Sequence, residues 1–219
     1  MRSPFDPGFE DLPKVIPIFP LAGVLLLPRG TLPLNIFEPR YLNMTADALR
    51  QERVIGMVQP LDPEAQGDNP VVYPTGCAGR LTQFGETDDG RYLITLTGLC
   101  RFEIAEELPL HNGYRRVIPR WDAFAADLVE EAEPDIDRDR LVERLRPYFD
   151  AQGIDADWEA IAETPDERLV TALAMLCPFE PREKQALLEC PTLAERNDAM
   201  IALMEMALTD DEGADSVLH

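Results

Sequence analysis

Serine and lysine, two of the side chains that act as nucleophiles in enzymes, are scarce in this chain of 219 residues. Its two serines, Ser3 and Ser216, both lie close to a terminus, where a nucleophile is not held rigidly beside a base. Its two lysines, Lys14 and Lys184, do not complete the glycine-rich loop G-x-x-x-x-G-K-[ST] that cradles phosphate groups. The sequence therefore argues against serine–lysine catalysis and against a phosphate-binding loop.

The remaining candidates for nucleophile or metal ligand are four cysteines: Cys77, Cys100, Cys177 and Cys190. No two of them form a C-x-x-C pair, and the two histidines lie far from them in the sequence, so the ligand spacing of a zinc site is absent. Reduced, mostly buried thiols are the interpretation that this spacing favours. A cysteine nucleophile with His111 as its base has no local motif to support it. We therefore expect no catalytic residue, no metal and no cofactor.

The net charge of −21 falls almost entirely on the second half of the chain. Residues 1–120 carry 12 basic and 15 acidic side chains, net −3, whereas residues 121–219 carry 8 basic and 26 acidic ones, net −18. A protein that binds nucleic acid needs a basic surface to displace counterions from phosphate. We therefore expect no nucleic-acid partner. The acidic excess is either a solvated surface or a dock for a basic partner.

The sequence shows neither a membrane helix nor a secretory signal. Its longest candidate apolar run, Val24–Leu27, is ended by Pro28 and is far shorter than the roughly 18 residues that a membrane helix needs. The N-terminus lacks a basic stretch followed by an apolar one. We therefore expect a cytoplasmic protein that does not associate with membranes.

Short extended runs make up most of residues 14–122, after an irregular, proline-containing lead-in at residues 1–13. Prolines interrupt the first runs, and because proline donates no ladder hydrogen bond, these strands should lie at sheet edges or contain bulges. One helix is predicted from Pro39, since proline suits the first helical turn. The predicted strands are Val15–Phe19, Gly23–Leu27, Thr31–Ile36, Val54–Val58, Gly79–Phe84, Arg91–Thr97 and Tyr114–Trp121.

The clearest local signal is the sequence Asp88-Asp89-Gly90 between two extended runs. Asp-Gly suits the positive φ of a hairpin turn, so it predicts that the flanking strands pair with each other. Gly98 follows the return strand and predicts a β-bulge there.

Composition changes near Asp122. Residues 123–136 are acidic and rich in alanine, and we interpret them as a linker. From residue 137 to 208 apolar residues recur at helical spacing, which predicts a bundle of helices. Two capping-box sequences, Thr164 to Glu167 and Thr192 to Glu195, should begin helices in this part. Residues 209–219 are predicted to be a flexible acidic tail.

Four segments resemble one known family in both order and spacing: residues 16–21, residues 32–41, Asp89-Gly90-Arg91 and Gly98 to Phe102. The segment from residue 32 to 41, Leu-Pro-Leu-Asn-Ile-Phe-Glu-Pro-Arg-Tyr, is the most specific. The chain is similar, over residues 14–208, to the N-terminal substrate-binding domain of Lon-type ATP-dependent proteases. The resemblance implies an α+β fold, in which a β-rich PUA-like barrel with one helix is followed by an α-helical bundle.

A complete Lon protease continues into an ATPase domain and a serine–lysine peptidase domain, and this chain stops before them. The resemblance therefore implies a stand-alone Lon-domain protein without catalytic activity. Its signature residues are expected to be structural: Glu38 favours the helix N-terminus, Arg40 pairs with an acid, and Tyr41 packs its ring. These signature residues are Pro33, Phe37, Glu38, Pro39, Arg40, Tyr41, Gly90, Gly98, Arg101 and Phe102.

The family's role implies a non-catalytic module that binds unfolded polypeptides or exposed apolar segments, with a separate protease or chaperone as a further candidate partner. Met200, Met204 and Met206 are candidate polypeptide contacts because thioethers repack easily, although filling of the core is their other interpretation. The main alternative is an adaptor that docks on a separate protease through the acidic helical half. A small-molecule site between the two parts is a further alternative.

Overall fold

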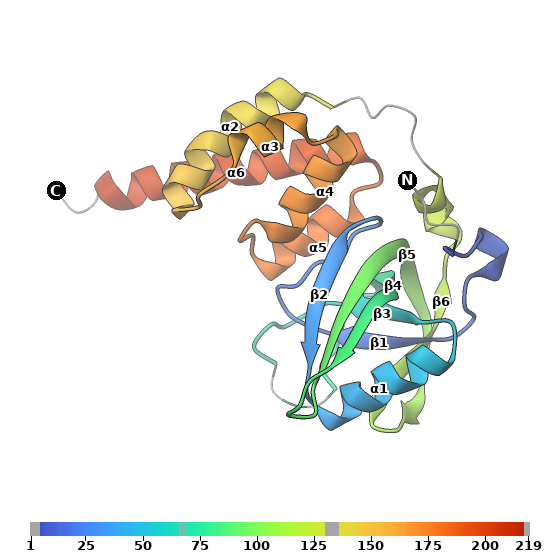
Figure 1. The fold of residues 1–219 in the computed structure, drawn as a ribbon. Coiled ribbons are helices and arrows are strands. Elements are labelled where there is room, and N and C mark those ends of the chain that lie inside the picture. Colours follow the sequence, from blue (N-terminus) through green and yellow to red (C-terminus); the bar gives the residue numbers. More distant parts are fainter. Residues whose placement is uncertain (1–4, 66, 68, 130–135, 217–219) are drawn as a thin grey trace. The chain divides into compact units, whose positions relative to one another are not determined.

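The computed structural model describes residues 5–65, 67, 69–129 and 136–216. The chain folds as two compact units, Met1–Glu130 and Glu131–His219 (Figure 1). Strands make up most of the first unit and helices make up the second, so the predicted α+β class is confirmed. The described part of the expected lead-in contains a 3₁₀ turn, η1 at Phe9–Asp11.

The first unit is built on a six-stranded sheet with the strand order β2-β5-β4-β3-β1-β6. Because β5 also pairs with β6, five strands close into a barrel and β2 remains outside the circuit at the edge of the sheet. The predicted barrel is therefore present. Its strands are β1 Ile16–Pro20, β2 Thr31–Ile36, β3 Val54–Val58, β4 Thr75–Glu86, β5 Tyr92–His111 and β6 Tyr114–Arg120. The one helix of this unit, α1 at Pro39–Arg50, contacts β1 and β6.

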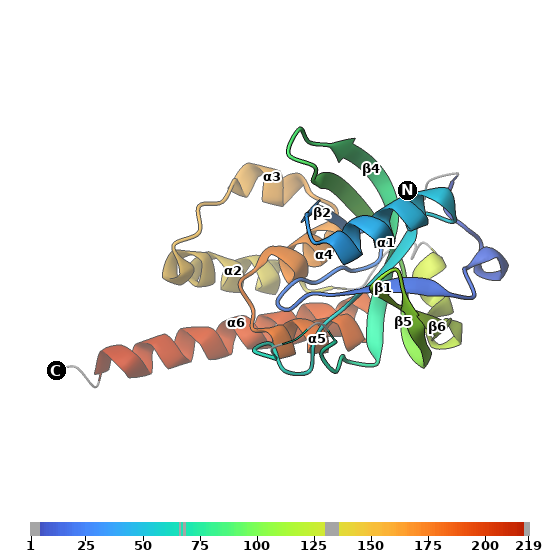
Figure 2. The same cartoon turned by 90° about the horizontal axis from the view of Figure 1, so that it is seen from below.

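The strands β4 and β5 are longer than the sequence indicated and extend beyond the barrel. The strand β3 pairs with β4 only up to Arg80, whereas β4 continues to pair with β5 as far as Glu86. On the other side of this extension β5 pairs with β2. We call β2, residues 81–86 of β4 and residues 92–97 of β5 the three-stranded arm; its hairpin projects from the barrel in Figure 2.

The turn and the bulge predicted at the two glycines are both present. Gly90 has φ +81°, and its N–H donates to the carbonyl of Thr87 to close the hairpin. At Gly98 the register of β4 and β5 shifts by one residue, because Ala78 pairs with Cys100 and Gly79 pairs with Gly98. The arm therefore meets the barrel at a β-bulge.

The predicted strand at Gly23–Leu27 is wrong, because this segment forms no ladder. Its leucines Leu25, Leu26 and Leu27 are all buried, whereas successive side chains of a strand point to opposite faces. The carbonyl of Leu27 lies against Gly98, where a Cβ atom would come within 1.9 Å of it. The segment thus crosses the arm as a buried loop, and a side chain at residue 98 would block that crossing.

The interior of the barrel is centred on Phe102, whose side chain is fully buried. Gly56 and Gly76 leave room for its ring, since a Cβ at either position would lie within 3.0 Å of it. Trp121 meets the same ring edge-on, with 5.7 Å between the ring centroids. Around them the barrel core consists of Ile16, Ile18, Val54, Val58, Ala78, Leu99, Cys100 and Val117.

The boundary of the linker is a correction to the sequence analysis. Residues 123–128, expected in the linker, belong to a 3₁₀ helix, η2 at Asp122–Leu128, that contacts β5. Both oxygens of the Asp127 carboxylate accept hydrogen bonds from Arg101, so a tertiary ion pair holds η2 on the barrel. Residues 130–135 of the expected linker lie outside the described residues.

The second unit contains five helices among its described residues, and α6 packs against α2, α4 and α5. The predicted capping box at Thr164 is wrong, because its hydroxyl donates to the carbonyl of Ala160 at the end of α3. The last helix runs to Ser216, so the predicted tail is helical where it is described, and residues 217–219 lie outside that part. The helices are α2 Arg138–Gln152, α3 Trp158–Glu163, α4 Asp166–Leu176, α5 Pro181–Glu189 and α6 Leu193–Ser216.

Candidate functional site

The signature segment forms the corner between β2 and α1. Glu38 occupies the N-cap position of α1 and Pro39 follows as its first residue. The Nε and Nη2 atoms of Arg40 lie 2.9 and 2.8 Å from Oε2 of Glu38, so the acid that pairs with Arg40 comes from the same corner. Tyr41 is buried, and its ring lies 4.2 Å from that of Phe19. These contacts position the end of β2.

Phe37 differs from the other aromatic signature residues because its side chain faces solvent. It is 60% exposed, whereas Phe102 is fully buried. The guanidinium group of Arg91 makes a cation–π contact with the Phe37 ring, with 5.8 Å between the guanidinium carbon and the ring centroid. Phe37 directly follows β2, so it adds an exposed apolar group to the end of the three-stranded arm.

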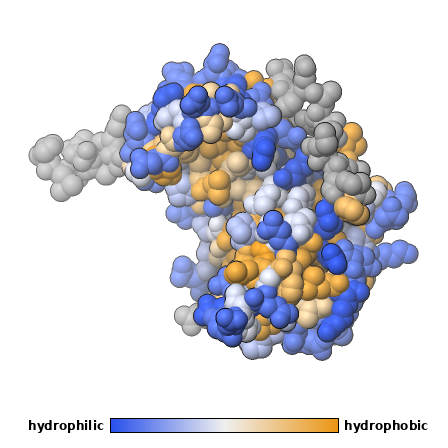
Figure 3. Space-filling model, viewed as in Figure 1, coloured by the Kyte–Doolittle hydropathy of each residue, from blue (hydrophilic) through white to orange (hydrophobic). Residues whose placement is uncertain are grey.

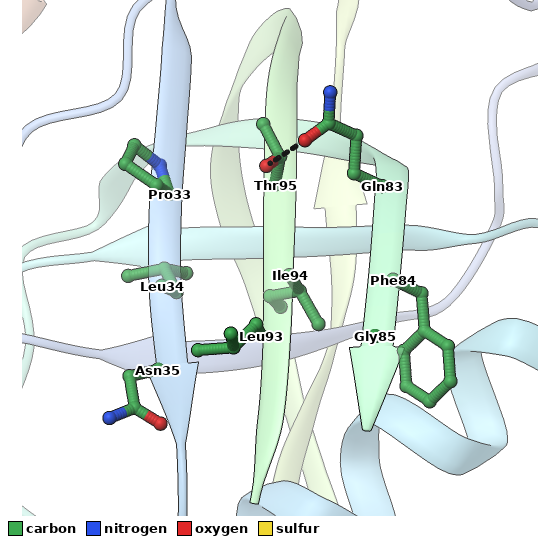
Figure 4. Close-up of a pocket in the computed structure, with 9 residues that line it drawn as sticks. All are labelled: Pro33, Leu34, Asn35, Gln83, Phe84, Gly85, Leu93, Ile94 and Thr95. Atoms are coloured by element: carbon green, nitrogen blue, oxygen red, sulfur yellow. Dashed lines mark hydrogen bonds between the residues drawn. The ribbon is translucent and has the colours of Figure 1, made fainter. Parts of the chain in front are cut away.

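The outer face of the three-stranded arm contains an open hollow of about 520 Å³ (Figure 4). The pleat places two rows of side chains on this face, one of Pro33, Thr95 and Gln83 and one that contains Asn35 and Leu93. A hydrogen bond of 3.1 Å joins the hydroxyl of Thr95 to Oε1 of Gln83. The lining residues are Pro33, Leu34, Asn35, Gln83, Phe84, Gly85, Leu93, Ile94 and Thr95.

The hollow exists because Gly85 stands opposite Leu93 and places no side chain beside it. A Cβ atom at Gly85 would meet no heavy atom within 4 Å. Leu93 itself is 52% exposed on this face. Phe84 is also exposed, but it pairs with Ile94 and its side chain therefore belongs to the opposite face of the arm. Figure 3 shows apolar residues gathered on this side of the first unit. The arm thus presents an apolar contact surface rather than an enclosed pocket for a small molecule.

The outer edge of the arm is formed by the backbone of β2. The N–H of Gly98 donates to the carbonyl of Gly30, so Gly30 and Gly98 form a hydrogen-bonded pair between β2 and β5. By the alternation of an antiparallel pair, the N–H and C=O groups of Thr31, Pro33 and Asn35 then point away from β5. Pro33 has no N–H to leave unpaired there, so the prediction that proline-containing strands lie at edges or contain bulges is confirmed for β2. It is wrong for β1, which contains Pro17 but lies between β3 and β6 without a shift of register.

The proposed methionine contact is corrected by burial. Met200 and Met204 are fully buried in the helical unit, so they fill its core and offer no surface to a polypeptide. Met206 is 59% exposed, but Met200 and Met204 do not reach the surface beside it. The methionines therefore do not form a joint contact surface.

The thiols of Cys100 and Cys177 are buried, and His111 lies beside Asp47 and Tyr114. Burial raises the pKa of Cys100 and of Cys177 to about 12, so both thiols remain protonated. His111 lies with Nε2 3.7 Å from Oδ2 of Asp47, and its ring meets that of Tyr114 edge-on. No cluster of three or more His, Cys, Asp or Glu side chains suited to a metal occurs in the described part of the chain.

Asp47 joins α1 to the hairpin between β5 and β6, and we expect acid to weaken this connection. A hydrogen bond from Asn112 is the main cause that lowers the pKa of Asp47 below 3.8, and Tyr114, His111 and Arg50 add to it. A carboxyl whose pKa is lower in the folded state stabilises the fold above its unfolded pKa, and this contribution is lost as the pH falls through the folded value.

In the Asp47→Asn variant, the urea concentration at the midpoint of unfolding should therefore decrease less steeply below about pH 4 than in the wild type. Glu52→Gln, at an exposed carboxylate just after the same helix, is the control and should keep the wild-type slope. Equal slopes for Asp47→Asn and the wild type below about pH 4 would contradict this role.

A profile of the ATP-dependent protease La (LON) substrate-binding domain matches residues 15–206. The chain belongs to the Lon substrate-binding domain family. Lon protease 2 of Myxococcus xanthus is 28% identical over 202 residues, which cover 89% of this chain and 24% of that protein. Lon protease of Bacillus thuringiensis (strain Al Hakam) is 23% identical over 202 residues, which cover 88% of this chain and 24% of the relative. The chain thus spans about a quarter of the length of these curated relatives.

Two solved structures share the fold. The Lon N-terminal domain protein from Xanthomonas campestris has a TM-score of 0.60 at 22% identity, with 86% of this chain and 97% of that one covered. The N-terminal domain of Mycobacterium avium complex Lon protease has a TM-score of 0.62 at 17% identity, with 88% and 98% covered. Among the described residues, no helix is long and apolar enough to cross a bilayer.

Sequence reasoning missed most of the residues that build the hollow. Among the lining residues it marked Pro33 but passed over Leu93, Phe84 and Gln83. One signal was present: Leu93 stands out of phase with Tyr92, Ile94 and Leu96, so it had to be an apolar residue on the solvent face. The pairing of Arg101 with Asp127, 26 residues away, had no such signal.

Proposed function

We propose that this chain is a non-catalytic polypeptide-binding module that holds unfolded or exposed apolar segments on the outer face of the three-stranded arm. The observation that carries the proposal is the exposed apolar surface around Leu93 and Phe37 in a Lon substrate-binding domain family member. Monomeric proteins rarely leave such apolar groups gathered on one face unless they contact another molecule.

The shape of the site favours a polypeptide over a small ligand. The hollow is open, and its polar groups are the neutral side chains of Asn35, Gln83 and Thr95, two of which already bond to each other. Small-molecule sites are concave and bury most of the ligand. An open apolar strip with few fixed polar groups instead suits side chains of varied sequence. We infer broad, weak affinity for unfolded clients.

Leu93→Asp should weaken the binding of an unfolded client at least about tenfold, because it places a charge at the centre of the apolar face. The measurement is fluorescence anisotropy with fluorescein-labelled lysozyme kept unfolded by reduction and alkylation. Leu110→Asp is the matched control, since Leu110 lies on the same strand with 53% of its side chain exposed but does not line the hollow.

Three results would count against this proposal. Wild-type protein that fails to bind the unfolded client at about 100 μM would remove its basis. Equal losses for the two aspartate variants would move the site away from the arm. Binding that disappears at about 0.5 M salt would favour docking through the acidic helical half, because salt screens charge contacts far more than apolar ones.

A further inference from the structure

We infer that the bound polypeptide is extended and adds a strand to the free edge of β2, so that the hollow receives side chains from a segment aligned by backbone hydrogen bonds. This inference rests on the proposed function and names its binding mode. The strand β2 pairs with β5 alone among the described residues. Thr31, Pro33 and Asn35 are exposed along its other side.

The edge has the hydrogen-bonding pattern that an extended backbone needs. Three carbonyls, of Thr31, Pro33 and Asn35, point outward, together with the N–H groups of Thr31 and Asn35. An added antiparallel strand could form two hydrogen bonds with Thr31, two with Asn35, and one with the carbonyl of Pro33. Leu32 and Leu34 are only partly buried on the inner side of the same edge, so alternate apolar side chains of the added strand would cover them.

The same proline selects a foreign segment over a second copy of this chain. If two β2 edges paired about a twofold axis at Pro33, Pro33 would face Pro33 and both central N–H donors would be missing. A foreign segment opposite Pro33 loses only one of the two central bonds, since its own N–H still reaches the Pro33 carbonyl. A proline in the middle of an exposed edge is a known device against edge-to-edge association.

The charge around the arm indicates which kind of polypeptide segment can bind there. Residues 31–38 and 81–97 carry four carboxylates, Glu38, Glu86, Asp88 and Asp89, against the single cation Arg91, net −3. The whole chain is at −21, which opposes self-association. The partner that fits is therefore an extended apolar segment flanked by lysine or arginine rather than by acidic residues.

Amide hydrogen exchange followed by NMR tests the binding mode, with the unfolded, alkylated lysozyme as the probe. The Thr31 and Asn35 amides should exchange at least about tenfold more slowly when the client is bound, because they become hydrogen-bonded. The Leu32, Leu34 and Ile36 amides already bond to β5 and serve as internal references. Asn35→Ala removes the same lining side chain but keeps the N–H, so Asn35→Pro should weaken client binding several-fold more than Asn35→Ala does.

The outcomes separate this inference from the proposed function. If the client binds but the Thr31 and Asn35 amides exchange as fast as in the free protein, strand addition is overturned and the apolar surface remains the site. The same conclusion follows if Asn35→Pro and Asn35→Ala bind equally well while retaining the wild-type circular dichroism spectrum. If the wild type binds no client, the proposed function itself fails. Slower exchange together with the selective proline effect supports strand addition.

Discussion

Asp127→Ala should lower the free energy of unfolding of the first unit by about 3–5 kcal/mol, since removing one partner strands a buried charge. The side chains of Arg101 and Asp127 are only 5% and 8% exposed. Arg101 donates from Nε to Oδ2 at 2.9 Å and from Nη2 to Oδ1 at 2.7 Å. The backbone N–H of Arg101 also donates to Oδ2, at 2.9 Å, so the variant leaves three donors without that acceptor.

Urea unfolding followed by tryptophan fluorescence measures this loss. Trp121 belongs to the first unit and Trp158 to the second, so a Trp158→Phe background reports the first unit alone. Glu103→Ala is the control, because Glu103 pairs with Arg120 across β5 and β6 in an exposed ion pair. We expect the control to cost about 0–1 kcal/mol.

A double variant separates the buried charge from lost packing. Asp127→Leu combined with Arg101→Met leaves no charge inside, so it should be more stable than Asp127→Ala despite carrying two substitutions. A loss below about 1 kcal/mol for Asp127→Ala would show that η2 is not held by this pair. A double variant as unstable as the single one would point to packing instead.

Gly98→Ala should destabilise the first unit by roughly 3 kcal/mol and should also weaken client binding, because it strains the base of the arm. The new Cβ would lie 1.9 Å from the carbonyl oxygen of Leu27. Both atoms belong to the backbone region, so no change of rotamer relieves the clash. The N–H of Gly98 donates to the carbonyl of Gly30, and the carbonyl of Gly98 accepts from the N–H of Arg29. Because β2 begins at Thr31, directly after Arg29 and Gly30, a shift at Gly98 would move the start of β2.

Gly85→Ala is the matched control for this substitution. Gly85 lies on the neighbouring strand of the arm, and a Cβ there would meet nothing within 4 Å. We expect its effect on unfolding to stay within about 0.5 kcal/mol. Equal falls of the urea midpoint for Gly98→Ala and Gly85→Ala would show that the close approach of Leu27 is not the cause. The lower chain entropy of alanine in the unfolded state acts in the stabilising direction at both sites and cannot explain a fall.

Local signals predicted the elements whose conformation depends on neighbours in the sequence. The Asp88-Asp89-Gly90 turn was recognisable because positive φ is tolerated by few residues, and Gly90 has φ +81°. Pro39 marked the start of α1 because proline loses nothing at the first helical position. The scarcity of serine and lysine led to the expectation that serine–lysine catalysis is absent, and this expectation needs no structure. The family signature then supplied the barrel, which periodicity did not indicate.

Where local and tertiary preferences competed, the sequence misled. Gly23–Leu27 is apolar enough for a strand, but its leucines are buried on successive positions as the segment crosses the arm. Thr164 has the spacing of a capping box, but the end of α3 uses its hydroxyl. Residues 123–128 have the composition of a linker, because only the fold brings Asp127 to Arg101. Each of these depends on a partner remote in sequence.

The composition of the chain by itself determined that its second half is strongly acidic and that it holds only two serines and two lysines. Tertiary structure alone places the apolar face on which we propose that a polypeptide binds. Leu93 and Gly85 belong to different strands, and only the register of β4 with β5 sets them opposite each other to open the hollow. The pairing of β2 with β5 likewise decides which backbone groups of β2 face solvent, since a shift of one residue would turn the other set outward.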